Sequence, residues 1–382
     1  MVKQLNILYI TGNIEEVKGG PGTTTRMLCN ALIDLGHKVD LLTLDVDPDY
    51  LNSIDYSYKI YNIKTLFKKN IWGGLGIEFP KFILTKYKNY DFFLINSLWG
   101  VMDFFLLFMS TFLNLKGKVM IFPHGCLDKK ALEYSYLKKK LYNIIIQNPL
   151  IKIGNPLWGA LTNKEKQDIL SIYPFVNEEN IAIIPNGVII PKLSKEYISN
   201  IRKKFNLHKY ERVFTYIGRF HPKKNIENTI KAFISFNKEN DNKNVFLLFG
   251  PENELYNYLK NRYENKYVKF LGYIKGDEKF AILKNTDIFV LVSYSEGLPM
   301  AVLEAIGSGC KVVISNECNI EGVDKLGLGI YSKHRFSDIE KSFRQVVELV
   351  YDNKGVEIFM RKYNWDKSAK LLEKFLQRKS YE

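Results

Sequence analysis

Short apolar runs alternate with helix-like segments along nearly the whole chain, and this alternation constrains the fold most. The runs are rich in β-branched and aromatic residues, and helical segments at 23–36, 228–240 and 276–285 lie between several of them. Continuous apolar runs separated by helices are typical of parallel strands that are buried on both faces. The pattern therefore predicts an α/β chain with two parallel sheets. The expected strands are residues 5–10, 38–44, 92–97, 119–124 and 181–186, then 213–218, 244–250, 267–272, 288–293 and 311–315.

The chain has 382 residues, of which 46% are hydrophobic and 25% charged, so it is long enough for more than one core and excludes a disordered or fibrous protein. After the fifth run comes a polar, basic stretch at residues 188–212. We expect the domain boundary there, with one domain over residues 1–190 and a second over residues 191–360.

Lys and Arg number 55 against 41 Asp and Glu, a formal net charge of +14. The excess is larger after Pro185, with 34 basic against 24 acidic residues, than before it, with 21 against 17. This charge indicates a polyanionic partner (nucleic acid, anionic lipid or a phosphorylated substrate) or only a bias toward Lys, Asn, Ile and Tyr, and both interpretations stay open.

The cysteine and hydropathy patterns predict a cytoplasmic protein. The four cysteines form no C-x-x-C pair and have no metal-ligand spacing, which indicates a reduced compartment. The apolar stretch at residues 5–10 is too short for a signal-peptide core. The longest apolar run, residues 101–115, is too short to span a bilayer. We expect a buried helix there, with membrane-surface contact as the alternative.

In open α/β sheets, ligands bind beyond the carboxyl ends of the strands. After the first strand comes KGGPG at residues 18–22, a glycine-rich loop that enters a helix and could hold an anion or simply be a surface turn. His124 and Gly125 follow the fourth strand. A neutral imidazole there could hydrogen-bond a substrate hydroxyl, or the histidine could be structural.

The second half carries charged residues at its strand ends. Gly218 allows a tight exit from a strand, and Arg219 and Lys224 could bind a diphosphate or be solvated surface charges. The segment at residues 288–315 is the most informative. Its strand is followed by Glu296 and by a helix that we expect to begin with Pro299.

The helix after Glu296 offers two kinds of polar group to a ligand. Its first free amides, those of Met300 and Ala301, would favour an anion. Glu304 lies inside the apolar run AVLEAIG, where a carboxylate needs a partner. Both glutamates could accept hydrogen bonds from sugar or ribose hydroxyls.

In sequence order the chain contains KGGPG, PHG, IPNGV, GRFHPKKN, Phe249-Gly250 and the pair Glu296 and Glu304 with seven residues between them. With these motifs it resembles the retaining glycosyltransferases of the GT-B fold, family 4 (group 1), including those that build bacterial surface polysaccharides. The chain departs from the family where Asn225 follows Lys224 in place of a frequent glycine, and where Gly125 follows His124 in place of a frequent aspartate.

The resemblance implies two Rossmann-like domains facing across a cleft, the first for the acceptor and the second for the nucleotide-sugar. It also implies that a C-terminal helix, residues 361–382, returns to the first domain, and that the enzyme, a retaining hexosyltransferase, needs neither metal nor cofactor. The catalytic residues implied are Arg219 and Lys224 at the leaving diphosphate, Glu296 at the donor sugar and His124 near the reacting centre. The donor-binding residues implied are Gly19, Gly20, Gly218, Gly250, Tyr273, Ile274, Gly297, Leu298, Met300, Ala301 and Glu304.

The expected function is transfer of a sugar from a UDP- or GDP-sugar to a glycan acceptor, lipid-linked, in capsule, O-antigen or lipopolysaccharide assembly. Basic, aromatic segments at residues 64–76 and 129–150 suggest peripheral contact with the anionic inner face of the cytoplasmic membrane, or a core-packed helix with a solvated lysine face. The alternatives are a nucleotide-sugar epimerase, a phosphorylase or an inactive scaffold of the same fold, and a nucleic-acid binder. Only the net charge supports the last, so we expect no nucleic-acid partner.

Overall fold

The computed structural model describes residues 3–15, 20–54, 56–65, 78–96, 98–133 and 140–381. The chain divides into two units, unit 1 with residues 1–187 and 365–382, and unit 2 with residues 188–364. The chain therefore leaves unit 1 three residues before the expected boundary at 190 and returns to it four residues after the expected boundary at 360. Both crossings lie in segments without regular structure, since residues 184–194 belong to no helix or strand and Asn364 separates two helices.

Unit 1 is built on a seven-stranded parallel sheet with the order β3-β2-β1-β4-β5-β6-β7. The five strands expected in this half are present. Two further strands, β3 and β6, were missed because the first is only partly buried and the second contains glycine and alanine. The strands are β1 (Asn6–Ile10), β2 (Lys38–Leu44), β3 (Lys59–Ile63), β4 (Phe92–Ile95), β5 (Val119–Ile121), β6 (Leu157–Ala160) and β7 (Ile181–Ile183).

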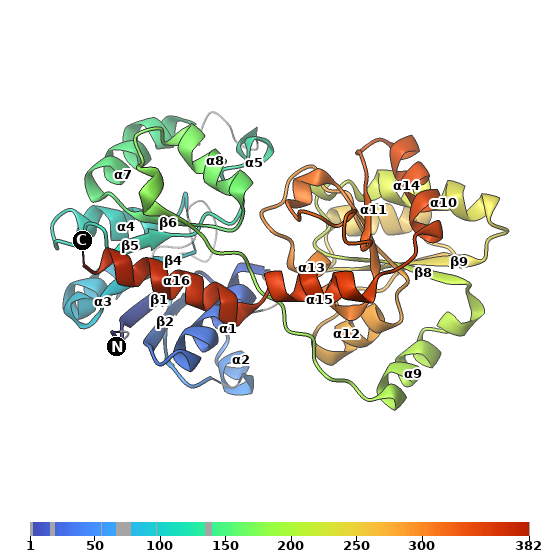
Figure 1. The fold of residues 1–382 in the computed structure, drawn as a ribbon, viewed down its shortest axis with the longest axis horizontal. Helices are drawn as coiled ribbons and strands as arrows, with labels where there is room; N and C mark the ends of the chain where they lie inside the picture. Colours follow the sequence, from blue (N-terminus) through green and yellow to red (C-terminus); the bar gives the residue numbers. More distant parts are fainter. Residues whose placement is uncertain are drawn as a thin grey trace. The chain divides into compact units, whose positions relative to one another are not determined.

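Helices cover both faces of the unit 1 sheet. On one face, the side chains of α3, α4, α7 and α8 pack with the strands in one hydrophobic core, and on the other face α1 lies beside α16 (Figure 1). The helices are α1 (Gly20–Asp34), α2 (Pro48–Ser53), α3 (Glu78–Lys86), α4 (Val101–Ser110), α5 (Lys129–Glu133), α7 (Asn148–Gly154), α8 (Asn163–Ile172) and α16 (Trp365–Lys379). Shorter turns are η2 (Tyr87–Asn89), η3 (Asn143–Gln147) and η4 (Glu178–Asn180).

The last helix, α16, is part of unit 1 although the chain reaches it from unit 2. Its Ser368 hydroxyl donates to the carbonyl of Pro185 at 2.6 Å. Its Glu373 carboxylate lies 3.1 Å from Nε2 of the buried His37, whose Nδ1 accepts a hydrogen bond from the amide of Leu5. These contacts join the end of the chain to the start of β1 and of β2.

Unit 2 is built on a six-stranded parallel sheet with the order β10-β9-β8-β11-β12-β13. The five expected strands are present, and β13 is an additional short edge strand that begins with a glycine. The strands are β8 (Arg212–Ile217), β9 (Asn244–Phe249), β10 (Val268–Phe270), β11 (Ile288–Leu291), β12 (Lys311–Ile314) and β13 (Gly329–Tyr331).

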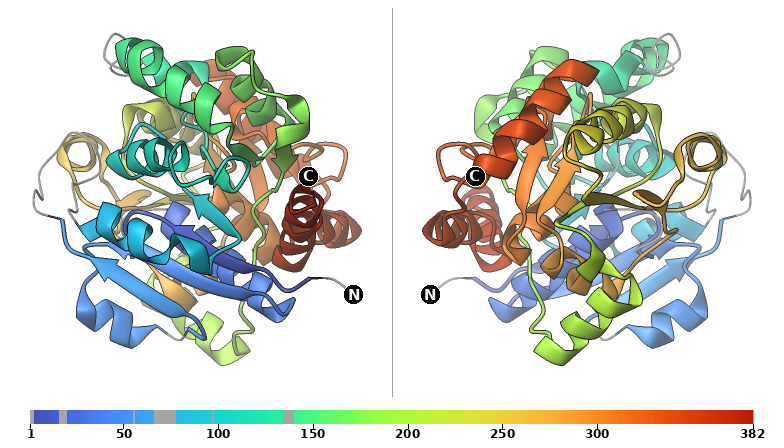
Figure 2. Two further views of the ribbon diagram at one scale, coloured as in Figure 1. Left: turned by 90° about the vertical axis from the view of Figure 1, so that its left-hand side faces the viewer. Right: turned by 90° about the vertical axis from the view of Figure 1, so that its right-hand side faces the viewer.

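The unit 2 sheet is also sandwiched between helices, with α10 against α14 on one side and α9, α12 and α13 packed in sequence on the other (Figure 2). The polar, basic stretch in which we expected the domain boundary contains a helix, α9, whose apolar residues recur at helical spacing. The helices are α9 (Lys195–Lys204), α10 (Ile226–Glu239), α11 (Glu254–Tyr263), α12 (Gly276–Lys284), α13 (Met300–Ser308), α14 (Phe336–Glu348) and α15 (Asn353–Lys362). Shorter turns are η5 (Leu207–Lys209), η6 (Pro222–Lys224) and η7 (Asn316–Cys318).

None of the four cysteines is in a disulfide. Within the described residues, no helix combines the length and the hydropathy needed to cross a bilayer.

The ends of β8 and β9 approach each other so closely that residue 250 has to be a glycine. The amide of Gly218 donates to the carbonyl of Phe249, and the amide of Gly250 donates to that of Gly272. A Cβ on Gly250 would lie 2.0 Å from the carbonyl oxygen of Gly218 and 3.0 Å from the ring of Phe220. The backbone itself is in the way, so a side chain at residue 250 would push the β8 loop outward.

We expect Gly250→Ala to lower the free energy of unfolding by about 2 kcal/mol, the usual size for overpacking in a buried site. Gly12→Ala is the matched control, because a Cβ on Gly12 would meet nothing within 4 Å. The comparison is urea unfolding of both variants and the wild type. Equal stability of the two variants would contradict the close approach described here.

Candidate functional site

In the unit 2 sheet the strand order reverses between β8 and β11, and such a reversal is where parallel sheets bind ligands. The loop after β8 carries Gly218 to Asn225, and the loop after β11 carries Ser293 to Pro299. The two loops are joined directly, since the amide of Tyr294 donates to the carbonyl of Lys223 at 2.7 Å.

A buried ion pair connects these loops. Nζ of Lys224 lies 2.5 Å from Oε1 of Glu296, with side chains only 11% and 8% exposed. Burial by itself raises the pKa of Glu296, but the charges of Lys224 and Lys223 outweigh burial and hold that pKa below its usual value. Glu296 is therefore an ionised carboxylate that can accept hydrogen bonds from hydroxyl groups.

Asn225 fixes the position of Lys224. It has left-handed backbone angles, φ 55° and ψ 33°, between η6 and α10. Asparagine tolerates this left-handed conformation, which glycine also adopts readily. Its side chain also donates to the carbonyl of His334 at 2.8 Å and accepts from the hydroxyl of Tyr294 at 3.0 Å.

Asn319 performs a similar role for Glu296. Its side-chain amide donates to the carbonyl of Glu296 at 2.7 Å and to that of Gly297 at 2.9 Å, and the amide of Glu296 donates to the carbonyl of Glu317. Sequence reasoning missed Asn319, which follows the expected strand β12, and His334, which follows the edge strand β13. Neither stands in a motif, so the only signal was their position beyond a strand end.

The helix after Glu296 begins one residue later than expected. Pro299 has ψ 114° and caps α13, which starts at Met300. Because an extended residue cannot start a helix, the expectation that Pro299 occupies the first helical position was wrong. Met300 and Ala301 are half-buried in the first turn, while Leu298 is buried. The first amides of a helix have no partner within it, so this end of α13 favours an anion.

Glu304 lies on the second turn of α13 and has the partner that its burial demands. Its Oε1 accepts a hydrogen bond of 2.7 Å from Nζ of Lys279 on α12, with side chains 11% and 19% exposed. Lys279 was not expected in the site, because a lysine on an amphipathic helix is usually a surface residue. A ligand hydroxyl that binds Glu304 would share the carboxylate with Lys279.

Arg219 is exposed, and its carbonyl accepts from the hydroxyl of the buried Tyr216 at 2.8 Å. Burial lowers the pKa of the neighbouring His221, and the charges of Lys223, Arg219 and Lys224 lower it further. The loop after β8 therefore concentrates positive charge around residues 219 to 224, which suits a diphosphate.

After β10, the strand end at Gly272 exposes one of the two expected side chains and buries the other. Tyr273 is exposed, but Ile274 is buried in the hydrophobic core with Leu247 and Phe249. The side chain of Ile274 therefore points into the core, and only its backbone could face a ligand. The amide of Gly250 is already used by the carbonyl of Gly272.

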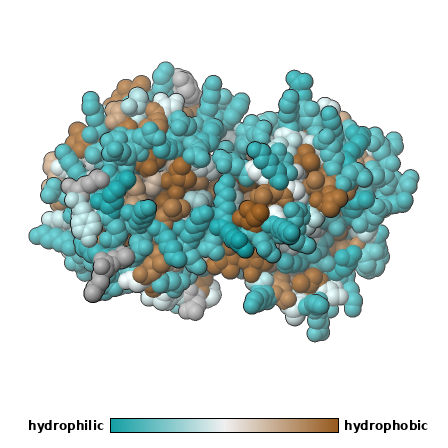
Figure 3. All heavy atoms as spheres, in the orientation of Figure 1, coloured by the Kyte–Doolittle hydropathy of each residue, from teal (hydrophilic) through white to brown (hydrophobic). Residues whose placement is uncertain are grey.

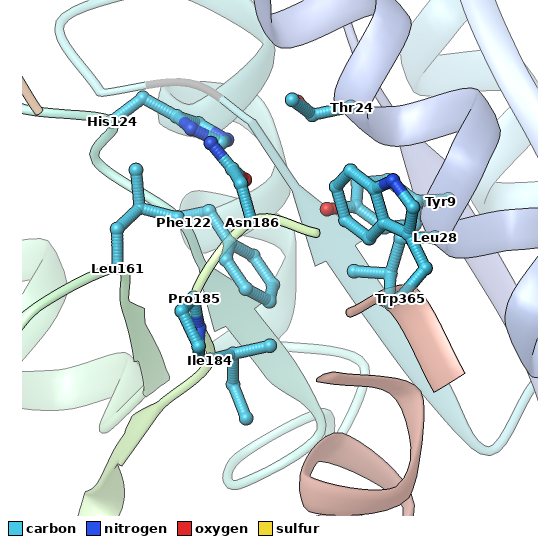
Figure 4. Close-up of a pocket in the computed structure, with 10 residues that line it drawn as sticks. All are labelled: Tyr9, Thr24, Leu28, Phe122, His124, Leu161, Ile184, Pro185, Asn186 and Trp365. Carbon is cyan, nitrogen blue, oxygen red and sulfur yellow. The ribbon is translucent and has the colours of Figure 1, made fainter. Parts of the chain in front are cut away.

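In unit 1, His124 lines a pocket at the strand ends with residues from β1, α1 and α16 (Figure 4). Its Nε2 is buried and has no hydrogen-bond partner within the described chain. Burial lowers the pKa of His124 to about 4, so the imidazole is neutral near pH 7. The lining residues are Tyr9, Thr24, Leu28, Phe122, His124, Leu161, Ile184, Pro185, Asn186 and Trp365.

The backbone at His124 is strained and anchored. Its φ is 51°, which is unusual for a residue with a side chain, and strain of this kind gathers at functional sites. Both oxygens of the buried Glu165 on α8 hold the loop, one accepting from the amide of Gly125 at 2.5 Å and the other from the amide of Leu161 at 2.7 Å. These hydrogen bonds fix the backbone on the C-terminal side of His124.

Of the glycine-rich loop, Gly19 lies outside the described residues. Gly20 is exposed and begins α1, so the helix starts inside the KGGPG motif. A Cβ on Gly22 would lie 2.7 Å from the carbonyl oxygen of Asn13, so this glycine lets α1 approach the end of β1. The structure thus brings Lys224, Glu296 and the first turn of α13 together in unit 2, and His124 and the start of α1 to the strand ends of unit 1.

The pKa of His124 makes stability depend on pH. Between its ordinary pKa of 6.5 and about 4, the unfolded chain binds a proton at His124 that the folded chain does not. The contribution of His124 should therefore lower the free energy of unfolding by about 2 kcal/mol between pH 7 and pH 5. His124→Asn keeps a residue that tolerates the backbone and should show a smaller decrease in urea unfolding. His208→Asn, at an exposed site, is the control, and an unchanged decrease in His124→Asn would contradict the prediction.

Two family models match the chain in succession. Glycosyltransferase Family 4 matches residues 18–190, and Glycosyl transferases group 1 matches residues 198–354. The chain is 28% identical over 217 residues to an uncharacterized glycosyltransferase of Methanocaldococcus jannaschii, covering 53% of this chain and 54% of that one. It is 33% identical over 167 residues to the UDP-Gal:alpha-D-GlcNAc-diphosphoundecaprenol alpha-1,3-galactosyltransferase of Escherichia coli, covering 41% and 42%. The matches thus span about half the length of these curated relatives.

Solved structures share the whole fold. Sucrose-phosphate synthase from Thermosynechococcus elongatus superposes with a TM-score of 0.73 at 17% identity, covering 98% of both chains. Anabaena HepE in complex with UDP-glucose superposes with a TM-score of 0.70 at 15% identity, covering 96% of this chain and 98% of that one. With two Rossmann-like units and both family models matched in order, the chain belongs to the GT-B glycosyltransferases of the group 1, family 4 type.

Proposed function

We propose that this protein transfers a sugar from a nucleotide-sugar donor to a glycan acceptor with retention of anomeric configuration. The observation that carries the proposal is the buried Lys224–Glu296 pair at the point where the unit 2 strand order reverses. A cation for a phosphate and an ionised carboxylate for sugar hydroxyls are held together there, next to the amide end of α13.

A UDP-sugar is the first donor to test, and a GDP-sugar is the alternative. The E. coli relative is named for UDP-Gal, and the HepE structure contains UDP-glucose. In this chain we assign the ribose hydroxyls to Glu304, the diphosphate to Arg219, Lys224 and the first amides of α13, and the donor sugar to Glu296.

The proposed chemistry follows from the charges. Breaking the anomeric C–O bond leaves negative charge on the nucleoside diphosphate, and fixed cations and helix amides lower the energy of that charge. When a donor binds, Lys224 can pair with a phosphate oxygen in place of Glu296. The carboxylate of Glu296 is then free to accept hydrogen bonds from sugar hydroxyls. His124, being neutral, can hydrogen-bond a hydroxyl without adding charge. Because lysine and arginine supply the positive charge, we propose that the reaction needs no metal ion.

We further propose that the acceptor is a lipid-linked glycan of bacterial capsule, O-antigen or lipopolysaccharide assembly, used in the cytoplasm at the inner face of the membrane. The E. coli relative is named for a diphosphoundecaprenol-linked sugar, which supports this acceptor class. We assign acceptor binding to unit 1, where His124 and its pocket lie.

The donor site is tested by thermal shift with UDP, GDP, ADP and CMP, each with and without magnesium. At about 100 times its dissociation constant a nucleotide adds roughly 2.7 kcal/mol of stability. We expect one nucleoside diphosphate to stabilise the wild type without magnesium, and Glu304→Ala to lose most of the effect. Lys279→Met breaks the same ion pair but keeps the carboxylate of Glu304. It therefore shows whether the effect is lost with the carboxylate or with the ion pair. If no nucleotide stabilised the wild type, a scaffold or a nucleic-acid binder would be favoured.

The catalytic role of the β8 loop is tested by substitution. Arg219→Ala and Lys224→Ala should each lower turnover about 100- to 1000-fold, the size seen when one preorganised electrostatic donor is removed. Lys231→Ala is the control, since this lysine forms an exposed pair with Glu227 on α10. The readout is nucleotide release from the donor found by thermal shift. Near-normal turnover in both loop variants would overturn the assignment.

A further inference from the structure

Two neighbouring helices of unit 1 expose large apolar side chains on their outer faces. One is α4 with the turn that follows it, and the other is the helix of residues 140–154, which includes η3 and α7. Phe112 is 73% exposed and Ile145 is 62% exposed, unusual values for such residues in a folded unit. We call the set the α4–α7 surface, and it consists of Phe108, Phe112, Leu141, Ile144, Ile145 and Ile153.

The two helices lie side by side and run in the same direction. The rings of Trp99 and Tyr142 are 6.2 Å apart, and Gln147 donates to the carboxylate of Asp103 at 3.3 Å. At the other end, a Cβ on Gly154 would lie 2.9 Å from the hydroxyl of Ser110. Because these contacts follow the same order along both helices, the outward faces form one surface. Figure 3 shows hydrophobic side chains at the molecular surface where Figure 1 labels α7.

Three aromatic rings on α4 and the turn that follows it form a row. The ring of Phe108 is stacked on that of Phe104, with centroids 6.0 Å apart, and meets that of Phe112 edge to face at 5.1 Å. Met102, Leu106 and Leu107 of the same helix are buried in the core. Helix α4 therefore has an apolar side for the core and a second apolar side that stays exposed among the described residues of unit 1.

The surroundings of this surface are positively charged. Residues 101–155 contain eight lysines and three acidic residues. Each acidic residue already has a partner. Asp103 accepts a hydrogen bond from Gln147, and Asp128 and Glu133 form ion pairs with Lys164 and Lys130. Exposed lysines in the described part of this segment include Lys116 and Lys118, which follow α4, and Lys140 and Lys152, which lie on the helix of residues 140–154. Of the expected basic segments, residues 66–77 and 134–139 lie outside the described residues.

We propose that the α4–α7 surface docks on an anionic phospholipid bilayer. Phenylalanine, leucine and isoleucine side chains would enter the boundary between head groups and acyl chains, while the lysines would reach lipid phosphates. A second copy of this chain fits less well, because a two-fold interface built from this surface would bring the lysines of both copies into one contact with few acidic residues to pair with them. The inference adds a partner to the proposed function, which calls for a lipid-linked acceptor, but the docking itself needs no catalysis.

The experiment is co-sedimentation of the full chain with vesicles of phosphatidylcholine, with and without phosphatidylglycerol, at low and high salt. We expect binding only to the anionic vesicles and weaker binding at high salt. Phe112→Ser with Ile145→Ser should weaken binding about tenfold or more, and Lys116→Glu with Lys152→Glu should do the same. The control is Val350→Ser with Ile358→Ser, which removes apolar side chains of unit 2 that are 86% and 54% exposed.

Nucleotide thermal shift and size measurement separate the outcomes. A wild type that shows a nucleotide shift but no vesicle binding at low salt would overturn the docking proposal and leave the donor site intact. Vesicle binding without any nucleotide shift would support docking while contradicting the proposed function. Equal vesicle binding by the surface variants and the control would overturn the proposal. A wild-type dimer that becomes a monomer in the Phe112 and Ile145 double variant would assign the surface to a second copy instead.

Discussion

The buried pair of Lys224 and Glu296 is the interaction on which the rest of the unit 2 site depends. Removing two charges from water costs more free energy than their attraction returns unless both are held in good geometry. The surrounding structure supplies that geometry. Asn225 and Asn319 fix the backbone on either side of the pair, and the close contact of Gly218 with Gly250 sets where the loop leaves the sheet.

The two units offer different electrostatic environments to a ligand. In unit 2, positive charge lowers the pKa of Glu296, so the site combines cations with an ionised carboxylate. In unit 1, burial lowers the pKa of His124, so the imidazole stays neutral. Charged groups suit a departing diphosphate, whereas a neutral ring suits a hydroxyl whose proton must be positioned. This difference agrees with the proposal that unit 2 binds the donor and unit 1 binds the acceptor.

Much of the fold was predictable because buried parallel strands have an unmistakable pattern, and all ten expected strands are present. The missed strands lack that pattern. Strands β3 and β13 lie at sheet edges and are only partly buried, and β6 contains a glycine. The motif residues Lys224, Glu296 and Glu304 could be found because motif spacing places them beyond strand ends. Lys279 and Asn319 could not, since they reach the site through folding from helices and loops that carry no motif.

The exposed face of α4 shows a further limit of hydropathy. The run at residues 101–115 is apolar nearly all around the helix, and such a run predicts a helix buried on every side. The sheet and the helix of residues 140–154 bury only part of it, and Phe104, Phe108 and Phe112 remain as an outward row. Sequence reports how apolar a helix is, but only the packing shows how much of that apolar surface the fold uses. The remainder, set among lysines rather than acids, is what an anionic interface would stabilise.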